Sequence, residues 1–414
     1  MNPLILCAIL SLGSTPTPRP AFPPAPAPTQ AEVEAVRAVV KANSAFAIDL
    51  HQRLCNQKGN LVYSPWSIST VLALTSVGAQ GETLAQMNKT LRLPEPRQTH
   101  VGVSQLLRLM QWQRGYEMNA VNAMFTGNNI PWRKDFLDYT RYYYGASIYT
   151  PNFRDQPEAS RQLINGWVEA QTRNRIRGLL PPGAIRPDTG IVLVNAIYFK
   201  GAWESPFKQH MTQVMNFSLT AKDKVAGLTM FQSGGFLYGE NETVQVLGMP
   251  YQGQDLMMML ILPRERNELA KLEKDLTGDH MQDWIARLEL HPTVDVFLPR
   301  FRLAFELNMK ETLADMGMRD LFNDNANLSG MATNHPLKVT GVLHKAFLEL
   351  QEEGTEAAAA TAIPAGVPLS PNPRFFTPPP PRPVFRADHP FLFSIVDRRS
   401  GSLLFMGRMS DPTK

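Results

Sequence analysis

Residues Glu352–Ala362 read EEGTEAAAATA, and the conformation of this stretch decides which fold the chain can adopt. Alanine and glutamate are strong helix formers, so the composition by itself favours a surface helix. With the two-residue period of a strand, one face from Thr355 to Thr361 carries only small or β-compatible side chains, and the other carries the charge of Glu356. Such a strand could slide between two existing strands without clashes, with the flexible backbone of Gly354 as its hinge.

A segment that no helix could enter follows directly. Residues 363–383 read IPAGVPLSPNPRFFTPPPPRP, and proline at this density removes backbone donors and blocks helix formation. The run Pro378–Pro381 favours a stiff, extended spacer of the polyproline II type. The sequence therefore predicts an exposed loop close to the C-terminus.

The composition is that of a folded protein. Apolar residues make up 43% of the 414 residues and charged residues 19%, enough to build a large core. The formal net charge of +4 is scattered along the chain, without the basic face that nucleic-acid binding requires. Near LLRLMQWQR only Arg108 and Arg114 are basic, so no glycosaminoglycan cofactor is predicted. We expect a monomer that binds neither nucleic acid nor membranes.

Three segments are distinguished by composition. Residues 1–14 contain the apolar run PLILCAILSL, which is too short to span a bilayer and is typical of a secretory signal peptide. Residues 15–31 are a Pro/Ala-rich spacer. Residues 32–414 keep the composition of one folded domain, with a loop at about 352–386. We therefore expect a secreted protein, extracellular or periplasmic.

Hydrophobic periodicity places helices mainly in the first part of the chain and strands in the second, which favours an α+β fold with a large sheet. Helices are expected at 33–54, after Pro65 and at 162–180, and a short strand precedes Pro65. Further strands are expected at 191–203, 255–263, 293–307, 337–350 and 390–409, the last range holding two strands joined by a turn at Arg399–Ser402.

Motifs for catalysis are lacking in the sequence. It contains no G-x-S-x-G, H-E-x-x-H or G-x-x-x-x-G-K-[ST] pattern, and its eight histidines are dispersed without metal-ligand spacing. The run Met257–Met259 is interpreted as core packing, and His344, inside a predicted strand, as a buried, hydrogen-bonded residue. We expect neither an enzyme nor a metal or other cofactor.

Several runs together resemble the serpins, from about residue 32 to the end. They are GNLVYSPWSI (59–68), VNAIYFKGAWESPF (194–207), FLPRFRL (297–303), VLHKAFLELQEEGTEAAAATA (342–362) and HPFLFSIVDRRSGSLLFMGR (389–408), in the family's order. The resemblance implies about nine helices, three β-sheets and an exposed reactive loop. It also implies a suicide inhibitor of serine endopeptidases, which traps the protease as an acyl-enzyme when the cut loop inserts into the main sheet.

The same resemblance implies roles for individual residues. The hinge that enters the sheet first is matched by Glu353, Gly354, Thr355, Glu356, Ala357, Ala358, Ala359, Ala360 and Thr361. The region beneath the main sheet is matched by Asn60, Ser64, Pro65, Ser67, Asn195 and His344, and the point where insertion begins by Trp203.

The cleavage site departs from the family's pattern. The usual spacing from the hinge places the scissile bond at Pro368–Leu369, but few serine proteases cut after proline. Leu369–Ser370 is preferred, since leucine suits a chymotrypsin-like or elastase-like protease. Pro364 would remove a hydrogen-bond donor from an inserted strand and could limit insertion. Two alternatives stay open: inhibition of papain-like cysteine proteases, and a non-inhibitory serpin that acts as a binding scaffold.

Overall fold

The structure, a computed structural model, describes residues 28–111, 115–145, 147–355 and 382–414. The expected signal segment, nearly all of the spacer, the hinge from Glu356 onward and the expected scissile bond lie outside the described residues.

Nine α-helices occur in this described part of the chain. They are α1 (Gln30–Leu54), α2 (Pro65–Ser76), α3 (Gly81–Leu91), α4 (Pro96–Gln111), α5 (Lys134–Tyr144), α6 (Pro157–Gln171), α7 (Leu269–Lys274), α8 (Gly278–Ala286) and α9 (Lys310–Asp315). The capping signals explain two of the starts. Thr29 and Glu32 form a reciprocal capping box at α1, and the Ser64 hydroxyl caps α2 ahead of Pro65.

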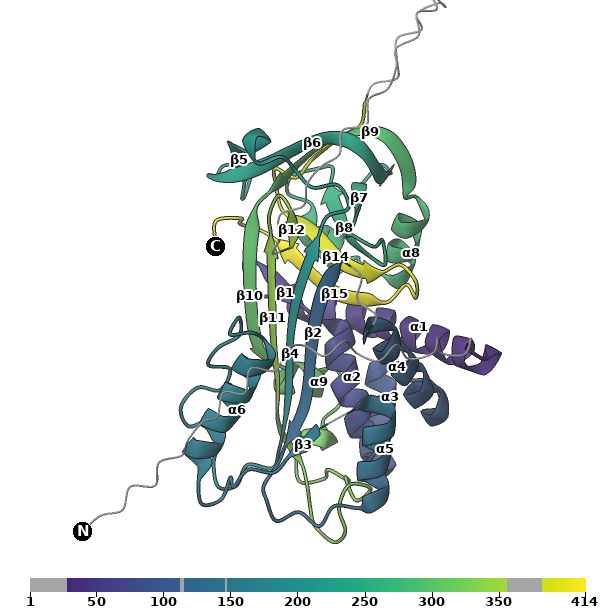
Figure 1. Ribbon diagram of the computed structural model, residues 1–414, viewed down its shortest axis with the longest axis vertical. Coiled ribbons are helices and arrows are strands. Elements are labelled where there is room, and N and C mark those ends of the chain that lie inside the picture. Colours follow the sequence, from purple (N-terminus) through teal and green to yellow (C-terminus); the bar gives the residue numbers. More distant parts are fainter. Residues whose placement is uncertain (1–27, 112–114, 146, 356–381) are drawn as a thin grey trace, which may run out of the picture.

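Six strands of the main sheet lie in the described residues. Their order is β10 (Phe301–Asn308), β11 (Val339–Leu350), β4 (Ile191–Ala202), β2 (Tyr116–Phe125) and β3 (Ser147–Tyr149), with β12 (Gly354–Thr355) paired to the end of β4. In Figure 1 this sheet runs vertically, with α6 on one side and the group α1 to α5 on the other. The continuous apolar run of β4 is buried on both faces, as its sequence predicts.

The two faces of β4 pack against different helices. Leu193 and Ile197 lie in core clusters that include residues of α2, whereas Val194 and Ala196 pack with Ile164 and Val168 of α6. Odd-numbered residues of β4 therefore face α2 and even-numbered residues face α6, a distinction that fixes the environment of any strand added beside β4.

The remaining strands form one nine-stranded sheet. Its order is β1 (Leu61–Tyr63), β15 (Leu403–Met409), β14 (Phe391–Asp397), β8 (Leu256–Pro263), β7 (Val244–Pro250), β6 (Lys224–Glu240), β9 (Glu289–Pro299) and β13 (Val384–Arg386), with β5 (Gln213–Ser218) paired to β6. The pairing of β6 with β9 shifts register between Gly234 and Phe236, where the sheet continues from one group of strands to the next. The strands expected to form a third sheet are thus joined to the second through β6 and β9.

The predicted α+β architecture is confirmed, and one helix boundary is wrong. The helix expected to reach residue 180 ends at Gln171. Arg173 and Asn174 have positive φ values of 49° and 60°, and the Thr172 hydroxyl donates to the carbonyl of Val168, 2.8 Å away. These local features end the helix at Gln171. A longer helix was predicted because the arginines that follow are good helix formers.

Candidate functional site

Two parallel strands separate at one end of the main sheet. Strands β4 and β11 pair in register from Ile191 beside Val339 to Tyr198 beside Phe347. Beyond that point β4 pairs with β12 instead, Gly354 lying opposite Ala202 and Thr355 opposite Gly201. We call this place, residues 198–203 with 347–355, the entry end. Because Gly201 also pairs with Tyr116 of β2 on its other edge, β12 occupies the edge of β4 that faces β11.

Gly354 is required at the entry end for two reasons. Its φ of +141° lies in a region that other residues rarely adopt. A Cβ atom there would lie 2.1 Å from the carbonyl oxygen of Gly201 and 2.6 Å from the Cα of Ala202. Besides the hinge role that the sequence resemblance implies, Gly354 thus allows a close contact between two backbones that only glycine permits.

The two glutamates before Gly354 anchor the start of the loop. The carboxylate of Glu352 is buried and accepts hydrogen bonds from Arg300, whose Nε lies 2.7 Å away, and from the hydroxyl of Thr212. The backbone carbonyl of Glu353 accepts from the N–H of Trp203 at 2.8 Å. These contacts fix the turn that joins β11 to β12.

Trp203 lies where the sequence places it, at the entry end. Its side chain is fully buried, stacks on Tyr251 with ring centroids 4.6 Å apart, and donates from Nε1 to the carbonyl of Gln351 at 3.1 Å. The indole thus packs under the chain that turns from β11 into β12. Its role at the start of insertion stays a prediction from the resemblance.

Midway along the same strands lies a group that we call the polar cluster: Ser64, Ser67, Asn122, Asn195 and His344. His344 Nδ1 is 2.5 Å from Asn195 Oδ1, and the backbone N–H of Ser64 donates to His344 Nε2 at 3.2 Å. Since Nε2 accepts, Nδ1 carries the proton and donates to Asn195, which fixes the tautomer. Burial lowers the pKa of His344 to about 3, so the ring is neutral near pH 7.

Asn122 is a member that the sequence analysis missed. Its Oδ1 accepts from the Asn195 side-chain amide and from the Ser67 hydroxyl, the latter at 3.3 Å. It sits in β2, directly across from Asn195 of β4. No local sequence signal marks it, because its partners are distant in the chain and only the strand register brings them together.

Asn60 is not part of this cluster. Its Nδ2 donates to the carbonyl of Asp411 at 2.7 Å, and its Oδ1 accepts from the N–H groups of Ser410 and Asp411 at 2.8 and 2.9 Å. Asn60 thus fastens the C-terminal segment after β15, and its contacts do not support the role implied for it under the sheet. Pro65 lies beside the cluster as the first residue of α2.

Among the described residues, no group of three or more His, Cys, Asp or Glu side chains is placed to hold a metal ion. Within the same ranges, no helix has the length and apolarity to cross a bilayer.

The chain matches known proteins over most of its length. The family model described as "Serpin (serine protease inhibitor)" matches residues 41–412. Human Serpin B4 is 37% identical over 393 residues, covering 90% of this chain and 99% of the relative. Human leukocyte elastase inhibitor is 38% identical over 384 residues, covering 90% of this chain and 98% of the relative.

Solved structures agree with these relatives. Human thyroxine-binding globulin superposes with a TM-score of 0.82 at 26% identity, covering 92% of this chain and 100% of that one. Uncleaved ovalbumin gives 0.80 at 28% identity, covering 91% and 100%. With β4 and β11 parted at the entry end and a polar cluster beneath them, the chain belongs to the serpin family.

Proposed function

We propose that this serpin is a suicide inhibitor of serine endopeptidases whose cleaved loop inserts between β4 and β11. The observation that supports this most directly is β12, because its two residues already pair with β4 on the edge facing β11. The rest of the loop would follow the same path. A loop joined only to the outer edge of a sheet would have no such slot to enter.

The register of β12 assigns a partner to each inserted residue. If each later loop residue pairs with one residue of β4, the pairing of Thr355 with Gly201 would place Thr361 opposite Asn195 and Pro364 opposite Val192. Directly opposed residues share a face of the sheet. The small residues from Thr355 to Thr361 at odd positions would thus face α2, where space is limited.

The charged face of the inserted strand would meet an opposite charge. Glu356 would lie opposite Lys200, which is half-buried on the α6 side of β4. Opposed unlike charges across antiparallel strands stabilise the pair by about 0.2–1 kcal/mol. The charge of Glu356 would therefore fall where it can be paired.

Insertion would also improve the hydrogen bonding of the sheet. It would replace the parallel contact of β4 with β11 by two antiparallel contacts, which are slightly more stable per residue. About a dozen residues gaining net bonds of ~0.5–1.5 kcal/mol each would contribute roughly ten kcal/mol or more. That is comparable with the ~5–15 kcal/mol stability of a protease, so distortion of the trapped enzyme is energetically feasible.

The polar cluster would have to rearrange during insertion. His344 and Asn195 lie on adjacent strands, and a strand between them would add about 4.8 Å to their separation. Their hydrogen bond would break, and the hydroxyl of Thr361, placed between them by the register, could bond to either. Insertion would therefore break a hydrogen bond of the polar cluster and replace it with a bond to the inserted loop.

The covalent step would occur at Leu369–Ser370. The serine hydroxyl oxygen of the protease attacks the carbonyl carbon of Leu369, the bond to the Ser370 nitrogen breaks, and that nitrogen receives the hydroxyl proton. An ester then links Leu369 to the protease until water hydrolyses it, unless insertion comes first. Leucine at this position suits a protease of chymotrypsin-like or elastase-like preference, and the name of the relative leukocyte elastase inhibitor agrees with that choice.

The decisive experiment mixes the full chain with chymotrypsin, elastase, trypsin and papain and follows covalent complexes on denaturing gels. Mass spectrometry identifies the released peptide, which is expected to begin at Ser370. Ala357→Arg would place a charge against buried Phe199 on the α2 face, so it should convert the inhibitor into a cleaved substrate. Pro378→Arg, beyond the cut, is the matched control and should still form the complex.

Three other outcomes would change the proposal. Cleavage of the wild-type chain by every protease without any complex would favour a non-inhibitory scaffold, with Pro364 opposite Val192 as the obstacle. Restoration of the complex by Pro364→Ala would confirm that obstacle. A complex with papain alone would assign the chain to the inhibitors of cysteine proteases.

We also propose that the protein is exported, on the basis of the apolar segment in residues 1–14. Expression of the full chain in a secreting host should release a product whose amino terminus lies within residues 15–31. Retention of an intact Met1 in the cell fraction would contradict export.

A further inference from the structure

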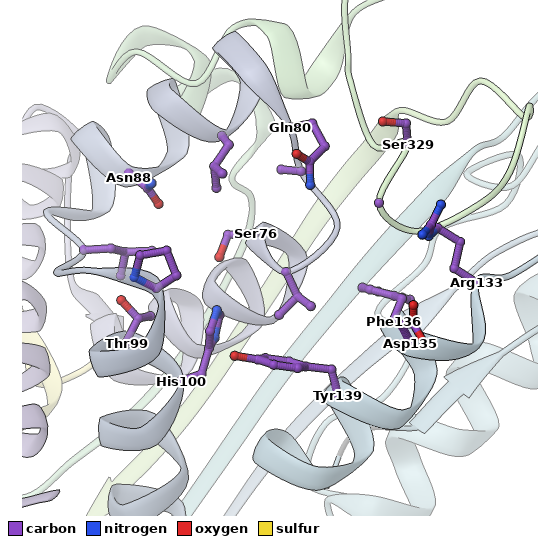
Figure 2. A pocket seen from close by; sticks show the side chains of 16 residues that line it. Ser76, Gln80, Asn88, Thr99, His100, Arg133, Asp135, Phe136, Tyr139 and Ser329 are labelled. Carbon is purple, nitrogen blue, oxygen red and sulfur yellow. The ribbon is translucent and has the colours of Figure 1, made fainter.

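A cavity of about 610 Å³ lies between the helices on the α2 side of the main sheet. It is bordered by the C-terminal end of α2, the starts of α3, α4 and α5, and residues 329–330 (Figure 2). None of the residues in the entry end or the polar cluster lines it. Its volume is within the range of sites that hold small organic ligands.

One wall of the cavity is held in place by two glycines. The N–H of Gly330 donates to the carbonyl of Gly78 at 3.1 Å, and a Cβ on Gly78 would lie 2.1 Å from Cγ of Met331. A Cβ on Gly330 would lie 2.8 Å from the Gly78 oxygen. The loop at 329–330 is thereby pressed against the end of α2, so this wall is formed before any ligand binds.

One end of the cavity offers polar groups. His100 is buried, and its Nδ1 lies 2.6 Å from the hydroxyl of Tyr144. Within the described ranges this is the only hydrogen bond of either side chain, so His100 Nε2 has no partner there. Figure 2 shows the Tyr139 hydroxyl directed at His100, and their rings meet edge to face at 5.1 Å. No partner of the Tyr139 hydroxyl occurs among the described residues.

The opposite end offers a positive charge. Arg133 precedes the first turn of α5, and its guanidinium has no carboxylate partner in the part of the chain that the structure describes. The N-terminus of α5 adds a partial positive charge at the same place. Among the described residues, Asp135 is the one carboxylate that lines the cavity. Between the two ends lie Val77, Leu84 and Phe136, which provide an apolar wall.

We propose that this cavity binds a small aromatic acid. The acid group pairs with Arg133 at the start of α5, and the aromatic body packs on Phe136 and Leu84. A second polar atom of the ligand bonds to His100 Nε2 or to the Tyr139 hydroxyl. Polar atoms of His100 and Tyr139 that have no partner among the described residues, and the guanidinium of Arg133 without a carboxylate partner there, line the same cavity and are complementary to such a molecule.

The test uses 8-anilinonaphthalene-1-sulfonate, a fluorescent aromatic anion, titrated into the full chain. We expect one saturable site, with the dissociation constant raised about tenfold in Arg133→Gln, as for loss of a charge-assisted hydrogen bond. Asp135→Asn, which removes the nearby negative charge, should lower it about two- to threefold. Tyr139→Phe should raise it about threefold without changing the fold, because the hydroxyl has no partner to lose.

Arg141→Gln is the matched control, since Arg141 lies on the same helix, is exposed and does not line the cavity. It should change the dissociation constant less than twofold, and thermal melts without the probe confirm that each variant is folded. Equal effects of Arg133→Gln and Arg141→Gln would overturn the proposal, as would the absence of a saturable site. An Asp135→Asn effect in the weakening direction would overturn the assignment of the acid group to Arg133.

Discussion

The entry end and the polar cluster both involve β4 and β11, but they are stabilised by different kinds of interaction. At the entry end an ion pair between Glu352 and Arg300 anchors the turn that joins β11 to β12. In the polar cluster neutral groups bond to one another, with His344 uncharged and in a fixed tautomer. Charge is used where the chain must stay in place, and neutral hydrogen bonds where, in the proposed mechanism, strands must part and re-form.

The difference has a physical basis. Arg300 is about one-third exposed, so water stabilises its charge at the entry end. His344 has no exposed surface, and a charge there would lack solvation. A neutral network can exchange one partner for another, such as a threonine hydroxyl, without leaving a bare charge in the core.

The largest expected effect comes from His344→Ala. It removes a buried ring and leaves the Ser64 N–H and the Asn195 carbonyl without partners, so we expect a loss of about 3–5 kcal/mol in the free energy of unfolding. The rate of loop insertion should change by a larger factor than the rate of cleavage by the protease. Denaturant unfolding and stopped-flow kinetics of complex formation measure the two effects. Unchanged insertion kinetics would remove His344 from the mechanism.

Acid should lower the stability of the folded protein through its two buried histidines, His344 and His100. Burial lowers the pKa of His344 to about 3 and that of His100 to about 4, whereas both are near 6.5 when unfolded. The unfolded chain therefore binds more protons between pH 6.5 and 4, so stability falls as pH falls through this window. From pH 7 to 5 each histidine contributes a loss of about 2 kcal/mol.

Urea unfolding of the wild type, His344→Gln and His100→Gln at pH 7, 6 and 5 separates these contributions. Each variant should show a shallower pH dependence by about one proton. If His344→Gln kept the wild-type slope, the ring would not be the neutral group that its contacts indicate.

A smaller effect is expected from Glu352→Gln, which leaves Arg300 without its carboxylate. Because Arg300 is partly exposed, we expect about 1–2 kcal/mol rather than the full cost of breaking a buried pair. Glu353→Gln is the matched control, since its carboxylate bonds only to the exposed side chain of Gln209 within the described residues. Urea unfolding at low and high salt measures the loss of stability in both variants. Equal losses in the two variants would mean that the Arg300 pair is not the anchor.

The smallest effect separates two asparagines. Asn60→Ala should lower stability by about 1–2 kcal/mol by freeing the segment after β15, with insertion kinetics unchanged. Asn122→Ala should lower stability by a similar amount and also change insertion kinetics, since it bonds to Asn195. A kinetic effect of Asn60→Ala would restore the role that the sequence resemblance implies for it.

Much of the fold could be predicted from the sequence because its signals are local. The apolar runs of β4 and β8 and the capped start of α2 identify themselves without knowledge of their partners. The end of α6 could not be predicted in this way, because helix-forming arginines follow it and the side-chain bond of Thr172 that ends it has no sequence signal. Boundaries of this kind depend on single hydrogen bonds that a periodic pattern does not contain.

The site was predictable where the family's motifs carry it and not elsewhere. Gly354 and Trp203 lie at the entry end, and Ser64, Ser67, Asn195 and His344 bond to one another in the polar cluster, while their roles in insertion stay predictions. Arg300 and Asn122 were missed, because each meets its partner only through strand register across more than fifty residues. Asn60 was misplaced, because a motif position does not state which way a side chain turns.

If the loop inserts as proposed, the pairing of Gly354 and Thr355 with β4 would set which face of the sheet each later residue takes. Adding or removing one alanine in the run Ala357–Ala360 would exchange the faces of all later residues and turn Thr361 toward α6, whereas a change of two would restore them. Loop length in this protein should therefore tolerate even changes and reject odd ones. In the proposed inserted strand, the run of four alanines would keep later residues on their original faces only if its length changed by an even number of residues.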